Sequence, residues 1–162
     1  MEGIAGTRVG IGAGAIEWLW AEAARVRPAR RRETKRRGEE AELVFQLAAV
    51  RRGFKVSKPH GDSYRYDFVL DNGERLWRVQ VKSTSNFHDG AYHVNCGRRL
   101  NQSAVPYKKS QIDFLVVYVV PEESWYIIPV ADLERRVSLL IYPKESSKGL
   151  YGTYREAWSL FG

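Results

Sequence analysis

Cysteine and long apolar runs are scarce in this chain. Cys96 is its one cysteine among 162 residues, so no disulfide can form within the chain, and a reducing cytoplasm is the expected location. No apolar run approaches the roughly 20 residues that a membrane helix needs. The nearest candidate, residues 11–24, is interrupted by Glu17 and Glu22 and lacks the basic leader of a signal peptide. We therefore expect a cytoplasmic protein without a membrane span.

Acidic residues are too few to balance the basic ones, and the formal net charge is +7. Such an excess favours a nucleic-acid partner. Most of it lies in one tract, residues 27–37, which holds seven basic side chains and one acid, Glu33. The tract fits either a solvated tail or an arm that binds phosphates. Charge alone does not choose between them.

The chain divides into a glycine-rich start, the basic tract and one domain of ordinary size. The run Gly10–Gly14 has no strand before it and no Lys-Ser/Thr pair after it, so we interpret it as a flexible start and not as a phosphate loop. Residues 16–23 place apolar side chains at helical spacing. This N-terminal part fits a disordered arm, a partner-binding helix or an over-extended gene start.

From Gly38 onward, helix and strand patterns alternate, which is typical of an α/β domain. A broad apolar face predicts a helix over residues 38–52, and Asn72-Gly73 between β-rich runs predicts a hairpin. Thr153 and Glu156 have the spacing of a capping box, which predicts a C-terminal helix. The expected strands are 54–57, 66–70, 76–84, 92–96, 114–120 and 125–129.

One strand carries the candidate chemistry on its polar face. Its residues 78–82 read Arg-Val-Gln-Val-Lys, and alternation places Gln80 and Lys82 on the same face. The hairpin brings Asp67 alongside them. The oxygens of Asp67, of the Gln80 amide and of the Val81 carbonyl are ligands that Mg²⁺ accepts. Lys82 can orient an attacking water and stabilise charge on a phosphate.

Glu42, on the first predicted helix, can add a second carboxylate to these ligands. The same pattern also has an ordinary structural interpretation. Any half-exposed strand alternates in this way, and an Asp followed by Gln-x-Lys in a hairpin is common. Spacing alone leaves both a metal site and a plain polar strand open.

Short segments follow one another in a definite order along the domain. They are Gly38–Glu42, Arg51–Val56, Gly61-Asp62, Arg65–Asp67, Arg78–Lys82, Tyr107, Ile112–Phe114 and Tyr126–Val130. This series resembles the PD-(D/E)XK nuclease superfamily, in particular the branch that includes a homing endonuclease of a cyanobacterial group I intron. The resemblance implies a nuclease domain over residues 35–162 and an N-terminal arm over residues 1–34, basic at its end. The implied fold is α/β with a restriction-endonuclease-like (tRNA-endonuclease-like) core, a central mixed β-sheet flanked by helices.

The resemblance also implies roles for individual residues. Asp67 matches the metal-binding aspartate, Gln80 the D/E position where this branch uses glutamine, Lys82 the catalytic lysine and Glu42 the helical glutamate. The implied cofactor is Mg²⁺ or Mn²⁺, with Asp67, Gln80, Glu42 and the main-chain carbonyl of Val81 as ligands. Gln80 in place of a carboxylate removes one negative charge, which weakens metal binding unless Glu42 compensates.

The implied reaction is hydrolysis of phosphodiester bonds in DNA. Tyr66 stands where the superfamily has proline, a position that serves geometry. Two other function classes stay open. One is a catalytically weak or inactive nucleic-acid-binding module, since inactive members of such families exist, and the other is a nuclease acting on RNA, since related folds process tRNA. A homo-oligomer, either a dimer or a tetramer, is compatible with this family.

Basic and amide side chains form candidate nucleic-acid contacts. Arg, Asn and Gln can read base edges, and Lys suits phosphates. A solvated loop explains the same composition equally well. The candidates are Lys58, Arg65, Arg98, Arg99, Asn101, Gln102, Lys108 and Lys109.

His88, His93 and Cys96 are the soft-metal ligands of this region. A structural zinc site takes four ligands, and these three are spread along a loop and a strand without a fourth partner. We interpret them as incidental residues of a loop and a strand.

Overall fold

The computed structural model describes residues 33–61, 63–142 and 149–162. The predictions for the glycine-rich start, for the helix at 16–23 and for most of the basic tract lie outside these residues. Arg37–Gly162 forms one compact unit. In the described part of the chain, no helix is both long and apolar enough to cross a membrane.

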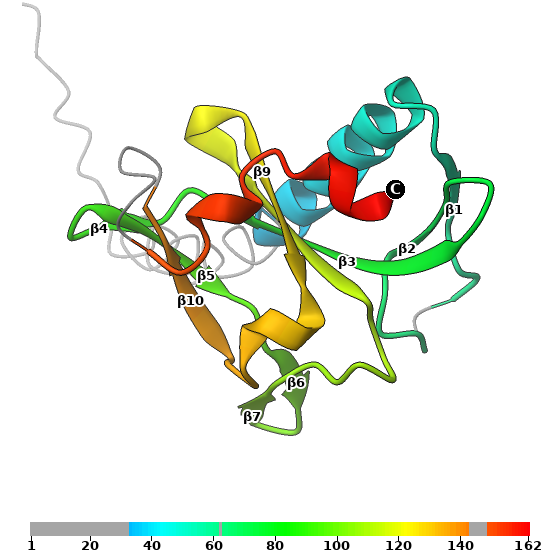
Figure 1. Cartoon of the computed structure of the whole chain (residues 1–162). Coiled ribbons are helices and arrows are strands. Elements are labelled where there is room, and N and C mark those ends of the chain that lie inside the picture. Colours follow the sequence, from blue (N-terminus) through cyan, green and yellow to red (C-terminus); the bar gives the residue numbers. More distant parts are fainter. Residues whose placement is uncertain (1–32, 62, 143–148) are drawn as a thin grey trace, which may run out of the picture. The chain divides into compact units, whose positions relative to one another are not determined.

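A five-stranded mixed sheet forms the centre of the domain (Figure 1). Its strand order is β1-β2-β3-β8-β9, in which β3 and β8 run parallel and the other neighbours antiparallel. This arrangement confirms the predicted α/β fold class with a central mixed sheet. The strands are β1 (Lys55–Ser57), β2 (Phe68–Asp71), β3 (Leu76–Thr84), β8 (Phe114–Val119) and β9 (Ser124–Pro129).

An α-helix over residues 33–51 covers one face of this sheet (Figure 1). Ala41, Phe45 and Ala49 recur every four residues and are buried against the sheet. Gly53, at a φ of 88°, adopts the left-handed conformation that commonly ends a helix, and its N–H donates to the carbonyl of Val50. The predicted helix and its terminating glycine are therefore confirmed, although the helix already includes residue 33 and Leu43, Leu47 and Val50 of its predicted apolar face are exposed.

Strands cover the opposite face. A second sheet of order β10-β5-β4 packs there and buries Val94 and Leu139 against Leu115 and Val117 of the central sheet. In the described part of the chain, one α-helix flanks the central sheet, where the resemblance implied several. The strands of this second sheet are β10 (Ser138–Ile141), β5 (Ala91–Asn95) and β4 (Phe87–His88).

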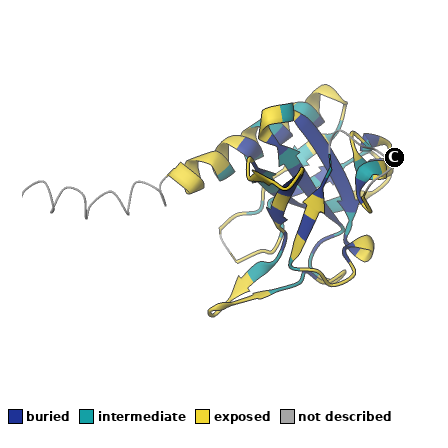
Figure 2. Ribbon diagram, turned by 90° about the vertical axis from the view of Figure 1, so that its left-hand side faces the viewer, coloured by how far each residue is buried: buried dark blue, intermediate teal, exposed yellow. Residues whose placement is uncertain are grey.

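A short hairpin, for which the sequence analysis expected no strands, follows β5. Strands β6 (Arg98–Leu100) and β7 (Ser103–Val105) pair antiparallel, and Asn101 makes the turn with a φ of 56°. Most of its residues are exposed, whereas the buried residues concentrate in the central strands (Figure 2). Its polar composition hides the period of two by which strands are recognised in a sequence.

The prediction of a C-terminal helix is wrong. Two short 3-10 helices, η3 (Gly152–Tyr154) and η4 (Trp158–Phe161), stand in its place. Two similar 3-10 helices, η1 (Val120–Glu122) and η2 (Val130–Leu133), occur earlier in the chain. The Glu156 carboxylate does not cap a helix, because it accepts hydrogen bonds from the main-chain N–H of Trp125 at 2.7 Å and from the Trp158 indole at 2.9 Å. This tertiary contact with β9 outweighs the local capping preference.

Replacing Phe45 by Ala is expected to destabilise the domain by about 3–5 kcal/mol. The Phe45 ring is fully buried and lies 5.5–5.8 Å from the rings of Phe68, Trp125 and Trp158, so its removal leaves a cavity between helix and sheet. Urea unfolding measures the loss. Leu43→Ala on the same helix is the control, since Leu43 is 67% exposed and its truncation should change stability by no more than about 0.5 kcal/mol. Equal losses in both variants would contradict this packing.

Candidate active site

The candidate site lies where β2 and β3 separate. Phe68, the first residue of β2, pairs with Val79 at the end of the β2–β3 ladder. The N–H of the preceding residue, Asp67, still donates to the carbonyl of Val79 at 2.8 Å. Beyond this point β3 has no backbone partner from β2, and the side chain of Asp67 accepts its hydrogen bond instead. Its Oδ2 accepts the main-chain N–H of Val81 at 2.8 Å. The carboxylate is therefore fixed against β3 by the backbone itself.

Gln80 joins this carboxylate to a main-chain carbonyl. Its side chain is buried, and its Nε2 donates to Asp67 Oδ2 in a short hydrogen bond and to the carbonyl oxygen of Val81 at 3.2 Å. One amide NH₂ group thus lies within reach of both oxygens. The oxygens of Asp67 and Val81 consequently converge on one small volume.

Glu42 reaches the same region from the helix. Its side chain is 25% exposed and forms an ion pair with Lys58 at 2.7 Å. The negative charge of Glu42 also raises the pKa of Asp67. Lys58, expected as a nucleic-acid contact, is thus engaged with a carboxylate of the site, and this contact raises its own pKa.

The carboxyl of Asp67 is held in an environment that disfavours its charge. Burial raises its pKa, and Glu42 adds to this effect. The hydrogen bonds from Val81 and Gln80 and the charge of Lys82 act in the opposite direction without outweighing burial. Among the described residues, no cation forms an ion pair with Asp67.

Lys82, whose charge acts on Asp67, lines a cavity of about 380 Å³. Arg65, Arg98 and Arg99 also line it, and no Asp or Glu does. The structure therefore gathers three of the expected nucleic-acid contacts next to Lys82. Lys82 affects the Asp67 carboxyl electrostatically but, within the described part of the chain, its ammonium group has no hydrogen bond or ion pair.

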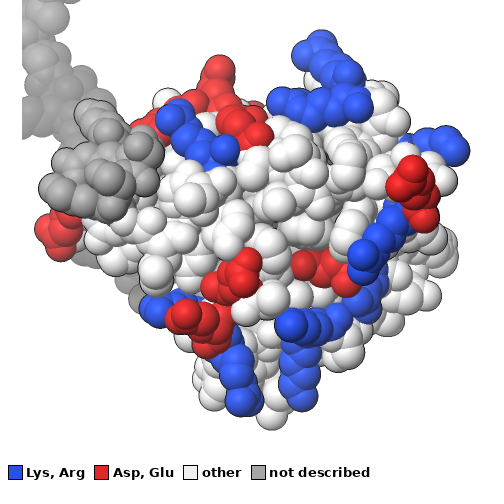
Figure 3. Space-filling view, in the orientation of Figure 1, with Lys and Arg blue, Asp and Glu red and all other residues white. Residues whose placement is uncertain are grey.

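The other expected contacts lie outside this cavity. Asn101 and Gln102 form the exposed tip of the β6–β7 hairpin, and Lys108 and Lys109 lie on the exposed connection to β8. On the face shown in Figure 3, Lys and Arg side chains gather along the lower and right-hand edges, with acidic side chains among them. These residues can contribute to a broad binding surface but not to the site itself.

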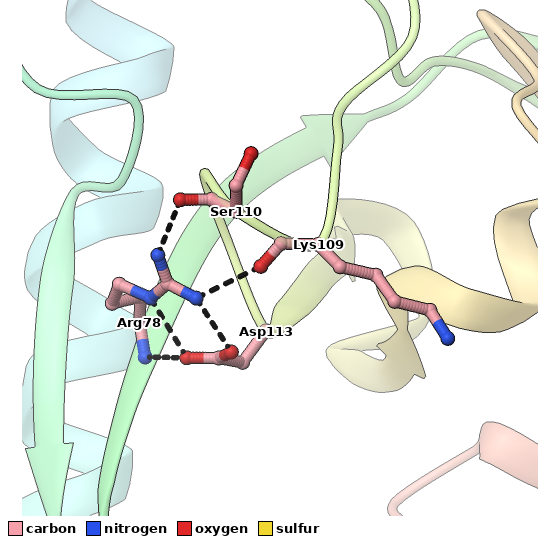
Figure 4. Close-up of polar contacts among 4 residues, drawn as sticks. All are labelled: Arg78, Lys109, Ser110 and Asp113. Carbon is pink, nitrogen blue, oxygen red and sulfur yellow. Dashed lines mark hydrogen bonds and ion pairs between the residues drawn. The ribbon is translucent and has the colours of Figure 1, made fainter.

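A clamp at the start of β3, which the sequence analysis missed, fixes the connection between β7 and β8 (Figure 4). The Arg78 guanidinium donates to both carboxylate oxygens of Asp113 and to the carbonyls of Lys109 and Ser110, at 2.6–3.1 Å. The main-chain N–H of Arg78 also donates to Asp113 Oδ2 at 2.8 Å. Burial raises the pKa of Asp113, but the hydrogen bonds from Arg78 outweigh it and lower the value. Arg78 and Asp113 are 35 residues apart, so no local sequence pattern indicates that they pair.

Two of the three candidate soft-metal ligands have other partners. His88 pairs with Asp89 at 2.8 Å, and the buried Cys96 thiol contacts the carbonyl of Arg136 at 3.5 Å. Burial raises the pKa of Cys96 to about 11. The described residues contain no group of three or more His, Cys, Asp and Glu side chains arranged to hold a metal. Any metal at the candidate site therefore depends on Gln80 and a main-chain oxygen in addition to Asp67 and Glu42.

Comparison with known proteins gives a consistent assignment. Residues 32–161 match the family model described as PD-(D/E)XK endonuclease. The solved structure of a bacterial homing endonuclease, I-Ssp6803I, is similar with a TM-score of 0.70 and 34% identity over 79% of this chain and 92% of that one. The crystal structure of MepB matches 58% of this chain and 72% of its own, with 18% identity and a TM-score of 0.39. This similarity is too low to indicate a shared fold or function. The comparison with curated proteins gave no match.

Replacing Asp67 by Asn is expected to raise the midpoint of urea unfolding at pH 7. The folded protein holds the Asp67 proton more tightly than the unfolded chain does, so stability falls as pH rises above the ordinary Asp pKa of about 3.9. The amide removes this cost while its oxygen still accepts the N–H of Val81. The gain should disappear as the pH falls below about 4, where the carboxyl is protonated in both states.

Asp113→Asn is the control with the opposite sign. Its lowered pKa contributes stability above the ordinary Asp pKa, and this contribution is lost as the pH falls. This variant should therefore be less stable than the parent at pH 7, with a smaller difference in acid. Similar losses at pH 7 for both variants would contradict the assignment of Asp67 as a destabilised carboxylate.

Proposed function

Because the chain belongs to the PD-(D/E)XK endonuclease family, we propose that it is a metal-dependent endonuclease that hydrolyses phosphodiester bonds in DNA. One observation carries this proposal. The oxygens of Asp67 and Val81 converge on the buried Gln80 amide, and Lys82 of the same strand lines a cationic cavity. The similarity to a homing endonuclease supports DNA as the substrate. The homo-oligomer and the cytoplasmic location stay predictions.

The donor set fits a small, hard divalent cation such as Mg²⁺ or Mn²⁺. Asp67 offers a carboxylate that is buried and not ion-paired within the described residues, and Val81 offers a main-chain oxygen next to it. The Gln80 NH₂ group bridges these two oxygens, so half a turn of the amide presents its own oxygen to the same volume. Glu42 supplies the second carboxylate. Oxygen ligands of this kind are those that Mg²⁺ takes in proteins.

We assign the remaining chemistry to the chain's own residues. A cation bound there would lower the pKa of a coordinated water and offset charge on the phosphate. The Lys82 ammonium orients the attacking water and stabilises the negative charge that develops on the phosphate. The main-chain N–H of Val81 keeps the Asp67 carboxylate in place. The ion pair with Lys58 holds Glu42 toward the site.

Lys82→Ala is expected to abolish Mg²⁺-dependent strand cleavage and leave DNA binding largely intact. Affinity for a nucleic-acid backbone is spread over many cations, whereas removing one group that stabilises the transition state costs about 10²-fold or more in rate. The assay follows nicking of plasmid and genomic DNA, with EDTA as the metal control and gel-shift binding in Ca²⁺ as the second readout. Arg51→Gln, which removes an exposed charge at the end of the helix, is the control variant. Wild-type cleavage that persists in EDTA would overturn the mechanism.

Gln80→Glu is expected to make the protein more dependent on a divalent cation. Without metal, the new carboxylate faces Asp67, and two like charges at this distance repel each other. In EDTA at pH 7 the variant should therefore unfold at a lower temperature than the wild type. Because a ligand that binds only the folded state stabilises it, Mg²⁺ should raise its melting temperature more than that of the wild type. Gln80→Ala should show no such gain, and an equal Mg²⁺ response in all three proteins would contradict the ligand role of Gln80.

Parallel substrates separate the proposed enzyme from its alternatives. Purified protein is incubated with Mg²⁺ and duplex DNA, single-stranded DNA or structured RNA. Cleavage of duplex DNA supports the proposal, and cleavage of RNA alone assigns the other substrate. Binding of DNA without cleavage of any genomic or plasmid substrate would favour a nucleic-acid-binding module.

A further inference from the structure

The Tyr107 side chain reaches the cationic cavity from the connection between β7 and β8. Its ring is buried in the apolar cluster beneath the central sheet, and the residue also lines the cavity beside Lys82. Among the described residues, its hydroxyl has no hydrogen-bond partner. Burial and the charge of Asp67 raise its pKa to about 12, although Arg65 and Arg98 oppose this effect. The hydroxyl therefore stays protonated at neutral pH and is available as a donor.

Arg98 brings a guanidinium group to the same cavity. Its Nε is enclosed by the protein and has no hydrogen-bond partner. A buried donor without a partner costs free energy, and such groups are uncommon in folded proteins. Arg98 lies close enough to act on the Tyr107 phenol. Arg98 and Tyr107 thus line one cavity, and no acidic residue lines it.

The position of Tyr107 is fixed from outside the cavity. The turn that follows it is closed by hydrogen bonds between Lys108 and Gln111, at 2.8 and 3.1 Å. The Arg78 clamp holds the carbonyls of the next two residues, Lys109 and Ser110 (Figure 4). A donor held in this way is preorganised, because little conformational freedom remains to be lost on binding.

We propose that Arg98 and Tyr107, together with Lys82, form a pocket that binds the non-bridging oxygens of a nucleic-acid phosphate. The cavity offers several cations and a neutral hydroxyl donor to an anion, and charge-assisted hydrogen bonds of this kind are strong and directional. Arg98 and Tyr107 are positioning residues, since they orient the backbone and leave the chemistry to Lys82 and its neighbours. This role rests on the proposed function, which supplies the polynucleotide.

Anion binding in the absence of metal tests the pocket directly. The wild-type protein is titrated in EDTA, at constant ionic strength, with the thymidine dinucleotide dTpdT, with inorganic phosphate or with thymidine. Amide chemical shifts of Gly97, Arg98 and Tyr107 are the readout. Both phosphate probes should give saturable shifts at these residues, and thymidine should give none. Shifts with inorganic phosphate but not with dTpdT would overturn a pocket for phosphodiesters.

Two variants and two matched controls make the test specific. Tyr107→Phe and Arg98→Gln should each weaken dTpdT binding by about tenfold, the usual effect of losing one hydrogen bond to a charged group. Tyr151→Phe removes the hydroxyl of another buried tyrosine in the same apolar cluster and should leave binding unchanged. Arg51→Gln is the charge control. Equal affinities in Tyr107→Phe and Tyr151→Phe would overturn the role of Tyr107.

A cleavage assay separates this proposal from the proposed function. If the site cleaves DNA, Tyr107→Phe should raise the KM more than it lowers the kcat. Phosphate binding at the pocket in a protein that cleaves no nucleic acid would overturn the enzyme and support the pocket. Cleavage by wild type and Tyr107→Phe with the same KM, together with no shift by dTpdT, would support the enzyme and overturn the pocket.

Discussion

The hydrogen bond from the main-chain N–H of Val81 to the Asp67 carboxylate is the contact on which the candidate site depends. In a continuing antiparallel ladder, this edge of β3 would pair with the backbone of β2. The strands separate on the N-terminal side of Phe68, and the side chain of Asp67 takes the place of the missing carbonyl. The carboxylate is therefore tied to the strand that carries Gln80 and Lys82. It is buried there next to Glu42, which explains why its pKa is raised and not lowered by its hydrogen bonds.

Packing around β3 stabilises the strand that carries this buried carboxylate site. Val79 and Val81 face the aromatic cluster under the helix, where Phe45 is fully buried. The alternate residues of the strand can then be polar without weakening that cluster. At its other edge β3 runs parallel to β8, and the Arg78–Asp113 clamp secures the start of this pair. The site thus sits on a rigid strand that is packed on one face and anchored at one end.

Features that depend on local sequence signals were predicted, whereas features that depend on contacts between distant residues were not. The Asn72-Gly73 turn sets the β2–β3 register, and this register alone brings Asp67 to Gln80. The helix was equally visible, but its buried stripe was not: Leu43, Leu47 and Val50, which contribute to the predicted apolar face, are exposed. The Arg78–Asp113 clamp depends on the parallel pairing of β3 and β8, which no turn sequence indicates. The polar β6–β7 hairpin lacks an alternating pattern of apolar residues. At the C-terminus, Thr153 and Glu156 satisfied a capping rule, yet the Glu156 carboxylate binds β9 instead.

Among the described residues, Asp67 and Lys82 carry opposite charges and lie near each other without forming an ion pair, whereas Glu42 pairs with Lys58. Lys82 acts on the Asp67 carboxyl, yet among the described residues no ion pair joins them, and Arg65 and Arg98 line the cavity beside Lys82. A close ion pair would stabilise the fold but would neutralise both groups. Left apart, the Asp67 carboxylate retains affinity for a cation and the cavity retains affinity for an anion. Under the proposed function these are the two charges that arrive together, a divalent metal and the phosphate it contacts. The unfavourable ionisation of Asp67 is then the cost in stability of a site that is completed by its ligands.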